Sequence, residues 1–105
     1  MAVQVKNRSI DIGVCTFRRP ELADTLRSLA AMAMPEGFDV SVIVADNDDT
    51  PSAQALVTAL SQELALPVRY RHAPARNISV ARNACLDASE ADFLAFIDDD
   101  ETAST

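Results

Sequence analysis

The sequence alternates strand-like apolar segments with amphipathic segments, and this alternation constrains the fold more than any other feature. Residues 9–15, 38–46, 68–72 and 92–98 are apolar and mostly rich in β-branched residues, which is typical of strands. Between them, leucine, valine and alanine recur at helical spacing. Strands that are separated by helices form a parallel sheet with helices on its faces, joined by right-handed crossovers. The sequence therefore predicts an α/β domain of the order βαβαβαβ.

Local signals place the ends of the three predicted helices. Pro20 suits the first turn of the first helix, which is expected to end before Pro35. The second helix is expected to use Thr50 as its N-cap and Pro51 as its first helical residue. The third is expected to start at about Ile78. The expected buried faces of the three helices hold Leu22, Leu26, Leu29, Ala30 and Ala33, then Leu56, Val57, Leu60 and Leu64, then Ile78, Ala81, Cys85 and Ala88.

Composition indicates a single folded domain. The 105 residues are 49% hydrophobic, with two glycines and five prolines that form no linker. The longest apolar run, residues 29–34, is too short to cross a bilayer, and the N-terminus lacks the apolar stretch of a signal peptide. We therefore expect a cytoplasmic protein. Cys15 and Cys85 are expected to be buried free thiols.

The charge of −7 is concentrated near one end of the sequence. Residues 1–86 contain nine basic and nine acidic side chains, so the whole excess comes from seven acids in residues 87–101. No basic face is available for phosphate backbones, which excludes nucleic acid as a general partner. The acidic end indicates a site for a cation, with a solvated acidic turn as the alternative.

Polar residues follow each predicted strand. The segments are CTFRRP, ADNDD, HAPARN and DDDE. In parallel sheets, ligands bind beyond the carboxyl ends of the strands, where the strand order reverses. The first, second and fourth strands are apolar enough to be buried on both faces. The sequence therefore predicts a binding site at the carboxyl edge of the sheet.

The acids after the fourth strand suit a hard divalent cation. Asp98, Asp99 and Asp100 offer the oxygen ligands that Mg²⁺ and Mn²⁺ prefer, and such ions usually share their shell with substrate phosphates. Arg76 and Arg82 flank a helix start, where guanidinium groups suit a phosphate.

Other residues near the predicted site have two interpretations each. Asp46 could accept a hydrogen bond from a base or ribose, or form a turn beside Asn47. Phe17 could stack on a base or cover the core. Arg69 and Arg71 are expected only to decorate their strand.

Taken together, the segments DIGVCTFRRPELADTLRSLA, VIVADND, NISVARNACLDAS and FLAFIDDDE resemble the nucleotide-binding half of family 2 glycosyltransferases. The resemblance extends from about Ile10 to Glu101 and is strongest to bacterial exopolysaccharide transferases of the succinoglycan type. It implies the GT-A fold, a Rossmann-like βαβαβαβ half with a mostly parallel sheet, truncated after the strand that carries the DXD motif. Residues 1–105 would be the part that binds the nucleotide-sugar donor, with the acceptor half absent.

The resemblance also implies roles for individual residues. Thr16, Phe17 and Arg18 would line the pocket for the base, and Asp46 would hydrogen-bond the base. Arg76, Arg82 and Asn83 would lie near the nucleotide.

The DXD motif corresponds to Asp98, Asp99 and Asp100. Asp100 would bind the metal directly. Asp98 and Asp99 would contact the ribose or the metal's waters, so that Asp98 and Asp100 form the expected metal site. One departure is the charge that Asp48 and Asp49 add near the diphosphate site.

The implied reaction is transfer of a sugar from a nucleoside-diphosphate sugar, with a UDP-sugar expected first, to a glycan or lipid-linked acceptor. It would serve exopolysaccharide or cell-surface polysaccharide synthesis, with Mn²⁺ or Mg²⁺ as cofactor. The catalytic base is expected in the absent half, so we predict that the 105-residue chain alone is inactive. Any attachment to the cytoplasmic face of the inner membrane would use that half.

Three other classes of protein are alternatives to a glycosyltransferase. A phosphoacceptor receiver domain gathers acids after its first strand, where this chain has CTFRRP. A nucleotidyltransferase favours a glycine-rich loop near the N-terminus, where this chain has Gly13. A non-catalytic module that binds a nucleotide or a partner stays open as the alternative.

Overall fold

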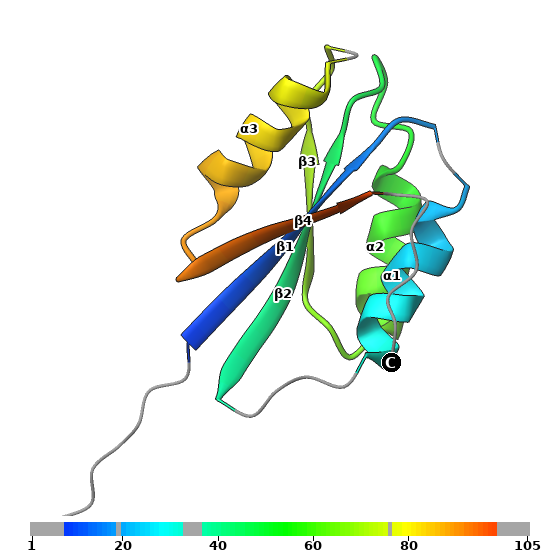
Figure 1. Ribbon diagram of the computed structural model, residues 1–105. Coiled ribbons are helices and arrows are strands. Elements are labelled where there is room, and N and C mark those ends of the chain that lie inside the picture. Colours follow the sequence, from blue (N-terminus) through cyan, green and yellow to red (C-terminus); the bar gives the residue numbers. More distant parts are fainter. Residues whose placement is uncertain (1–7, 19, 33–36, 76, 99–105) are drawn as a thin grey trace, which may run out of the picture.

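The computed structural model describes residues 8–18, 20–32, 37–75 and 77–98. Strands and helices alternate along this part of the chain, as predicted (Figure 1). In chain order, the elements are β1 (Arg8–Thr16), α1 (Leu22–Ala31), β2 (Phe38–Asp46), α2 (Gln54–Glu63), β3 (Val68–His72), α3 (Ile78–Ala88) and β4 (Phe93–Asp98).

The four strands form a parallel sheet of the order β3-β2-β1-β4. The chain steps outward from β1 to β2 and β3, and then returns to the other side of β1 to form β4. The strand order therefore reverses between β1 and β4. The carboxyl ends of β1, β2 and β3 lie near the top of Figure 1, which is the edge where the sequence predicts a site.

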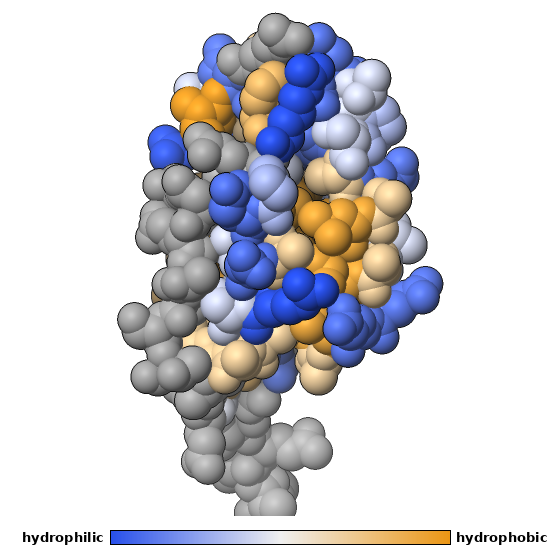
Figure 2. Space-filling view, turned by 90° about the vertical axis from the view of Figure 1, so that its right-hand side faces the viewer, coloured by the Kyte–Doolittle hydropathy of each residue, from blue (hydrophilic) through white to orange (hydrophobic). Residues whose placement is uncertain are grey.

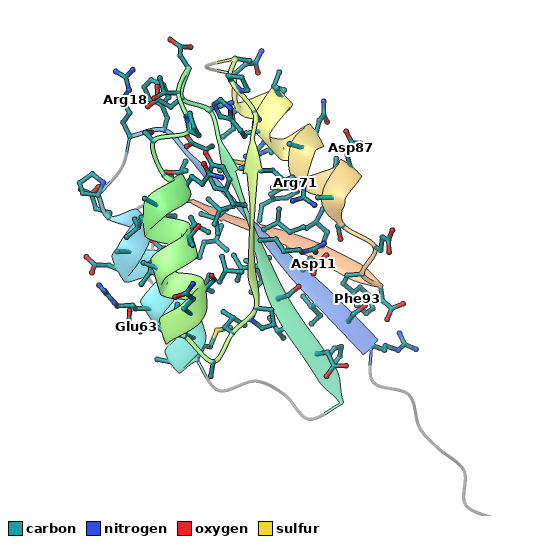
Figure 3. The ribbon with its side chains drawn as sticks, turned by 180° about the vertical axis from the view of Figure 1, so that it is seen from behind. Asp11, Arg18, Glu63, Arg71, Asp87 and Phe93 are labelled. Carbon is teal, nitrogen blue, oxygen red and sulfur yellow. The ribbon has the colours of Figure 1, made fainter. Side chains whose placement is uncertain are left out.

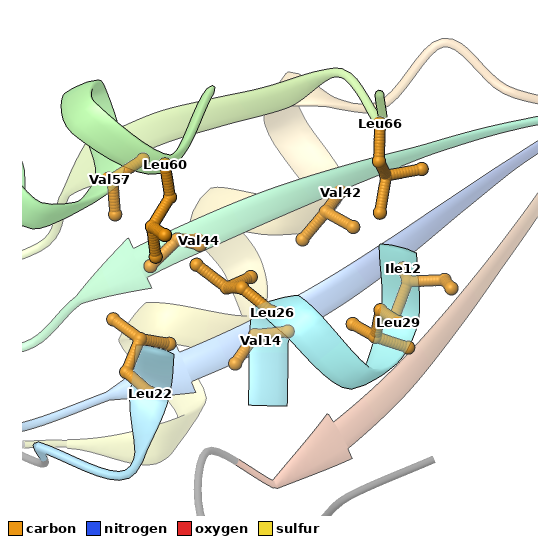
Figure 4. Close-up of a cluster of buried hydrophobic side chains, with 10 residues drawn as sticks. All are labelled: Ile12, Val14, Leu22, Leu26, Leu29, Val42, Val44, Val57, Leu60 and Leu66. Atoms are coloured by element: carbon orange, nitrogen blue, oxygen red, sulfur yellow. The ribbon is translucent and has the colours of Figure 1, made fainter. Parts of the chain in front are cut away.

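Helices cover both faces of the sheet, with α1 and α2 on one face and α3 on the other (Figure 1). The larger core lies under α1 and α2, because every second residue of β1 and β2 points toward these helices. Figure 4 shows this core, and its fully buried side chains include Leu26, Val42 and Val44. The cluster consists of Ile12, Val14, Leu22, Leu26, Leu29, Val42, Val44, Val57, Leu60 and Leu66.

The face under α3 is packed with smaller residues. Ile43 and Ala45 of β2 contact Ala81 and Cys85 of α3. Gly13 lets the neighbouring strand and helix approach closely, because a Cβ at this position would lie 2.7 Å from the ring of Phe96. The small side chains explain why α3 lies close to the sheet.

An ion pair between a buried carboxylate and a partly exposed arginine anchors the C-terminal end of α3. Asp11, on β1, is 4% exposed and accepts a hydrogen bond from Arg69 Nη2 at 3.0 Å. The hydroxyls of Ser41 and Ser89 also donate to Asp11, and Arg69 Nη1 donates to the carbonyl of Ala88 at 3.1 Å. Arg69 therefore links the end of α3 to the centre of the sheet, which the expected decorative role did not include.

Two details of the helices differ from the expectation. The second helix begins at Gln54 and not at Pro51, because residues 50–53 form turns in which the amide of Ser52 donates to the carbonyl of Thr50. Ile78 was expected to be buried but is 51% exposed, so its predicted place on the buried face of α3 is wrong. Only the smaller residues Ala81 and Cys85 are fully buried on α3.

The fourth strand is less covered than its apolar sequence suggested. Phe93 is 46% exposed and Phe96 is 40% exposed, so the expected burial on both faces is wrong for β4. The cause is its place at the edge of the sheet, next to β1 alone in the described chain. Neither Cys15 nor Cys85 forms a disulfide within the described ranges, as predicted, and Cys85 is buried, whereas the expected full burial of Cys15 is wrong because it is partly exposed.

Figure 2 faces the side of α1 and α2. It shows apolar side chains gathered in one area and bordered by hydrophilic ones. Leu56 of α2 and the C-cap residues Met32 and Leu64 are partly buried and pack against the core cluster. Within the described ranges, no helix has both the length and the apolar character needed to cross a membrane.

Candidate functional site

Three loops meet at the carboxyl edge of the sheet. Thr16 ends β1 opposite Asp46 of β2, and Asp46 in turn pairs in register with His72 at the end of β3. Backbone hydrogen bonds join the loops beyond the strands, from the amide of Asn47 to the carbonyl of Thr16 and from the amide of Ala73 to the carbonyl of Asp46, both at 2.8 Å. The sheet therefore places the loops after β1, β2 and β3 side by side.

A cleft with a volume of about 260 Å³ opens between the loop after β1 and the loop after β2. Apolar side chains from α1 and α2 form much of its wall, and Thr16, Arg18 and Ser52 supply polar groups. The lining residues are Thr16, Arg18, Pro20, Leu22, Ser52, Ala53 and Leu56. A cleft with apolar walls and a few polar groups is suited to a flat, partly polar ring.

Asp46 organises the loop after β2. The side chain is fully buried, and its Oδ2 accepts hydrogen bonds from the hydroxyl of Tyr70 at 2.7 Å and from the amide of Ala53 at 2.9 Å. Its Oδ1 accepts from the amide of Asp48 at 3.0 Å. Asp46 thus has the turn-forming role that the sequence allowed as one interpretation. Its contact with a base stays a prediction.

The pKa of Tyr70 is raised by its surroundings, which include the carboxylate of Asp46. Burial raises the pKa of the Tyr70 hydroxyl, and the hydrogen bond to Asp46 raises it further. Tyr70 therefore stays protonated and acts as a fixed donor to Asp46 across the neutral pH range.

A second carboxylate in the same loop holds Arg18. Asp48 is 1% exposed, and its Oδ2 accepts a hydrogen bond from Arg18 Nε at 2.9 Å. The hydrogen bond from Arg18 is the main reason that the pKa of Asp48 lies well below its usual range, with a further contribution from the Ser52 side chain. The carboxylate is therefore ionised at neutral pH, and it joins the loops on the two sides of the cleft.

Arg18 itself has an unusual backbone conformation. Its φ is 51°, in the left-handed region that residues other than glycine rarely adopt. Its guanidinium carbon lies 5.2 Å from the centre of the Phe17 ring, and both side chains are exposed at the edge of the sheet. Figure 3 shows Arg18 at that edge.

Two buried oxygen atoms beside the cleft lack hydrogen-bond partners. They are Thr16 Oγ1 and Asp48 Oδ1. In the described part of the chain, the buried side-chain nitrogen and oxygen atoms other than these two all have a hydrogen-bond partner. Leaving such an atom unpaired costs about 1–3 kcal/mol. Unpaired buried atoms at a cleft are a sign that a ligand supplies the missing partner.

The residues of α3 that were predicted to lie near the nucleotide are not among those that line the cleft. Arg82 and Asn83 are exposed on the helix that covers the opposite face of the sheet from α1 and α2. The guanidinium of Arg82 lies over the ring of Phe96 on β4, 5.8 Å from its centre. The structure therefore brings Thr16, Phe17, Arg18 and Asp46 together, and places Arg82 beside β4.

The predicted metal site is described only in part. Asp98 ends β4, and its backbone pairs in register with Cys15, the residue before Thr16. The residue at which the predicted DXD motif begins thus lies on the strand next to β1. The predictions for Arg76, Asp99 and Asp100 concern residues outside the described ranges. Among the residues inside those ranges, no group of three or more His, Cys, Asp or Glu side chains could hold a metal ion.

Sequence reasoning missed the part that Asp48, Ser52 and Tyr70 play. The only signal for Asp48 was the run of acids DNDD after an apolar strand, which does not tell which of them is buried. For Tyr70, the signal was its position between Arg69 and Arg71 on β3. This alternation indicates that Tyr70 faces the core, and the structure shows it packed against the core cluster.

Comparison with known proteins gives a consistent result. The model of the family described as "Glycosyl transferase family 2" matches residues 11–105. The "Succinoglycan biosynthesis protein ExoM" of Rhizobium meliloti (strain 1021) is 65% identical over 95 residues, which is 90% of this chain and 31% of that protein. The chain therefore spans about a third of the length of this curated relative.

Solved structures of S. aureus TarS 1-349 have a similar fold. The complex with UDP matches 88% of this chain and 27% of that chain, with a TM-score of 0.69 and 25% identity. The complex with UDP-GlcNAc matches 88% of this chain and 26% of that chain, with a TM-score of 0.67 and 22% identity. These likenesses confirm the α/β fold of the GT-A type.

Proposed function

Because this chain belongs to glycosyl transferase family 2, we propose that it forms the part of a glycosyltransferase that binds the nucleotide of a sugar donor. The observation that carries the proposal is the cleft at the carboxyl ends of β1 and β2, which has apolar walls and the unpaired hydroxyl of Thr16. This is the edge at which parallel α/β sheets bind nucleotides.

We propose a UDP-sugar as the donor. The similar TarS structures are complexes with UDP and with UDP-GlcNAc. The similar protein of Rhizobium meliloti is named for succinoglycan biosynthesis, which supports an exopolysaccharide or other cell-surface glycan as the product. The proposed acceptor is a glycan or a lipid-linked sugar, and the proposed location is the cytoplasm.

The cleft residues would each do a simple task. The apolar walls from Leu22 and Leu56 would exclude water from the two faces of the base. The hydroxyl of Thr16 would form the hydrogen bond that it lacks, and Phe17 would offer a ring for stacking at the cleft entrance. Arg18 would add positive charge where the nucleotide enters.

Asp98 and Asp100 would hold Mg²⁺ or Mn²⁺, since carboxylate oxygens are the ligands that these ions prefer. The register of the Asp98 backbone with Cys15 of β1 supports a metal site on the same side of the sheet as the cleft. A bound cation would supply charge neutralisation for the departing nucleoside diphosphate. The general base is expected outside this chain, so the 105-residue chain is proposed to bind the donor without transferring its sugar.

The proposal can be tested by titrating the purified chain with UDP while recording amide NMR spectra. We expect shifts in the loops after β1 and β2 that are larger with Mg²⁺, and we expect Mn²⁺ to broaden signals near the end of β4. Chelation with EDTA should weaken the binding. Uridine without the diphosphate serves as a control, because it should reach the cleft with little dependence on metal.

Two results would contradict the proposal. One is the absence of UDP binding at millimolar concentration in the presence of Mg²⁺. The other is a set of shifts confined to the outer surfaces of α1 and α2, away from the cleft. Acceptor-dependent sugar transfer by the chain alone would contradict the expected need for a further segment.

A further inference from the structure

Asp48 lies behind the wall of the cleft and contacts both of its sides. Its carboxylate binds Arg18 of the loop after β1 at 2.9 Å, and Ser52 of the next loop acts on the same carboxylate. Arg18 and Ser52 both line the cleft, whereas Asp48 is 1% exposed. The position of two lining side chains thus depends on one buried acid.

The backbone of the same residue is fixed from other directions. The amide of Asp48 donates to Asp46 at 3.0 Å, and the carbonyl of Asp48 lies 2.8 Å from Nε2 of His72 on β3. Asp48 is therefore held by β2 and β3, while its side chain reaches toward β1. It can therefore hold the long side chain of Arg18 in a fixed position relative to the sheet.

The geometry of the pair does not match a purely structural ion pair. The side chain of Arg18 is 56% exposed, and exposed ion pairs stabilise a fold only slightly. Arg18 also has a positive φ, which is unfavourable for its type. Oδ1 of Asp48 is buried without a partner. The weak ion pair, the unfavourable φ and the unpaired oxygen do little for the stability of the fold. Such an arrangement is expected at a site that binds a ligand.

We propose that Asp48 is a positioning residue for the donor nucleotide, which holds Arg18 in place at the cleft before the ligand arrives. This inference rests on the proposed function, because it assigns a further residue to the same site. With Arg18 fixed, the nucleotide does not have to order a long, flexible side chain on binding, and that loss of freedom would otherwise weaken the affinity. Asp48 itself acts through Arg18.

The test is a double-mutant cycle on UDP affinity in the presence of Mg²⁺. The variants are Asp48→Asn, Arg18→Gln and the double variant, each measured by calorimetric or NMR titration of the same 105-residue chain. We expect each single variant to lose about five- to tenfold in affinity, and the double variant to lose no more than the worse single variant. Such non-additivity is the sign of two residues that act as one unit.

Asp49→Asn is the matched control, because it removes the same charge from the next residue, which is exposed. We expect its UDP affinity to stay within about twofold of the unmodified chain, because an exposed charge is screened by water and salt. Thermal melting of every variant without UDP separates loss of folding from loss of binding. Asp48→Glu should recover part of the affinity, because it restores a carboxylate within reach of Arg18.

The outcomes separate the two proposals. If the unmodified chain fails to bind UDP, both the proposed function and this inference are wrong. If the unmodified chain binds UDP but Asp48→Asn binds equally well, only the inference is wrong. Additive losses in the cycle, or an equal loss in Asp49→Asn, would also overturn it, because the effect would then come from charge alone.

Discussion

Two buried aspartates in this chain each bind an arginine, yet their surroundings differ. Asp11, on the α3 side of β1, is fully engaged by Arg69, Ser41 and Ser89. Asp48, at the carboxyl edge, binds Arg18 and keeps one buried oxygen unpaired. Figure 3 shows Asp11 beside the sheet and Arg18 at its edge. A buried carboxylate whose oxygens are all paired serves the fold, whereas one that keeps an oxygen unpaired at a cleft is poised for a ligand.

The pKa values of the two carboxyl groups are lowered for different reasons. Burial alone would raise the pKa of Asp11, but the hydrogen bonds from Ser41 and Ser89 and the charge of Arg69 outweigh it, so the pKa is lowered. The pKa of Asp48 is lowered first by the hydrogen bond from Arg18 and next by the side chain of Ser52. Among the ionic partners, Asp11 is paired with an arginine of the sheet and Asp48 with an arginine of a loop that lines the cleft.

The largest effect on stability is expected from Asp11→Ala. This change leaves Arg69, Ser41 and Ser89 without their shared acceptor under α3. Breaking a fully buried pair costs about 3–5 kcal/mol, but the Arg69 side chain is 40% exposed and can regain water. We therefore expect a loss of about 2–3 kcal/mol in the free energy of unfolding. Urea denaturation checks it, and a loss below about 0.5 kcal/mol would remove Asp11 from its structural role.

A somewhat smaller loss is expected from Gly13→Ala on the same face. The new Cβ would meet the Phe96 ring at 2.7 Å and Cys85 Sγ at 3.2 Å, so β4 or α3 has to move. Phe96 is partly exposed and can shift, which keeps the expected cost at about 1–2 kcal/mol. Gly37→Ala is a useful contrast, because nothing lies near its Cβ and only its φ of 88° is unfavourable. Unchanged stability of Gly13→Ala would show that α3 is not closely packed on the sheet.

Most of the fold could be predicted from the sequence, because apolar periodicity and breakers such as Pro35 and Pro67 act locally. The element order and the start of α3 followed from these signals. The start of α2 did not, since it depends on a hydrogen bond from the amide of Ala53 to the distant Asp46. The exposure of Ile78 depends on how closely the helix packs over small residues, which is a tertiary property.

The candidate site was predictable as a location but not in its details. Parallel topology brings Thr16 and Asp46 to one edge, and this needs only the order of the strands. Which acid of the run DNDD is buried depends on the path of the loop. The partner of Arg18 was hidden for the same reason, since 30 residues separate it from Asp48.

A low pH should lower the stability of the folded protein moderately, because it protonates the carboxylates of Asp11 and Asp48. Each group has a pKa in the folded protein below its unfolded value of about 3.9, so its stabilisation is complete above about pH 5. The stabilisation is lost as the pH falls through the folded pKa. We expect the melting temperature to fall steadily below about pH 4. The fall should be shallower in Asp11→Asn, which lacks one of the two carboxylates. An identical pH profile for Asp11→Asn would contradict the lowered pKa of Asp11.

The smallest effect on stability is expected from Asp48→Asn. Arg18 is largely exposed, so the loss of the ion pair is screened by water, and release of the positive φ at Arg18 offsets part of it. The melting temperature without ligand should therefore fall less than it does in Asp11→Asn. A larger fall than in Asp11→Asn would reverse the comparison between the two pairs.

The most direct test of this account is the UDP affinity of Asp11→Asn and Asp48→Asn, measured side by side with Mg²⁺ at a temperature where both are folded. Both variants replace one buried carboxylate that is paired with an arginine, one at the carboxyl edge beside the cleft and the other under α3. The account predicts that Asp48→Asn binds UDP about five- to tenfold more weakly than the unmodified chain, while Asp11→Asn binds it equally well despite its lower stability. Equal affinities in the two variants, or a greater loss in Asp11→Asn, would contradict the placement of the nucleotide site at the carboxyl edge beside Asp48.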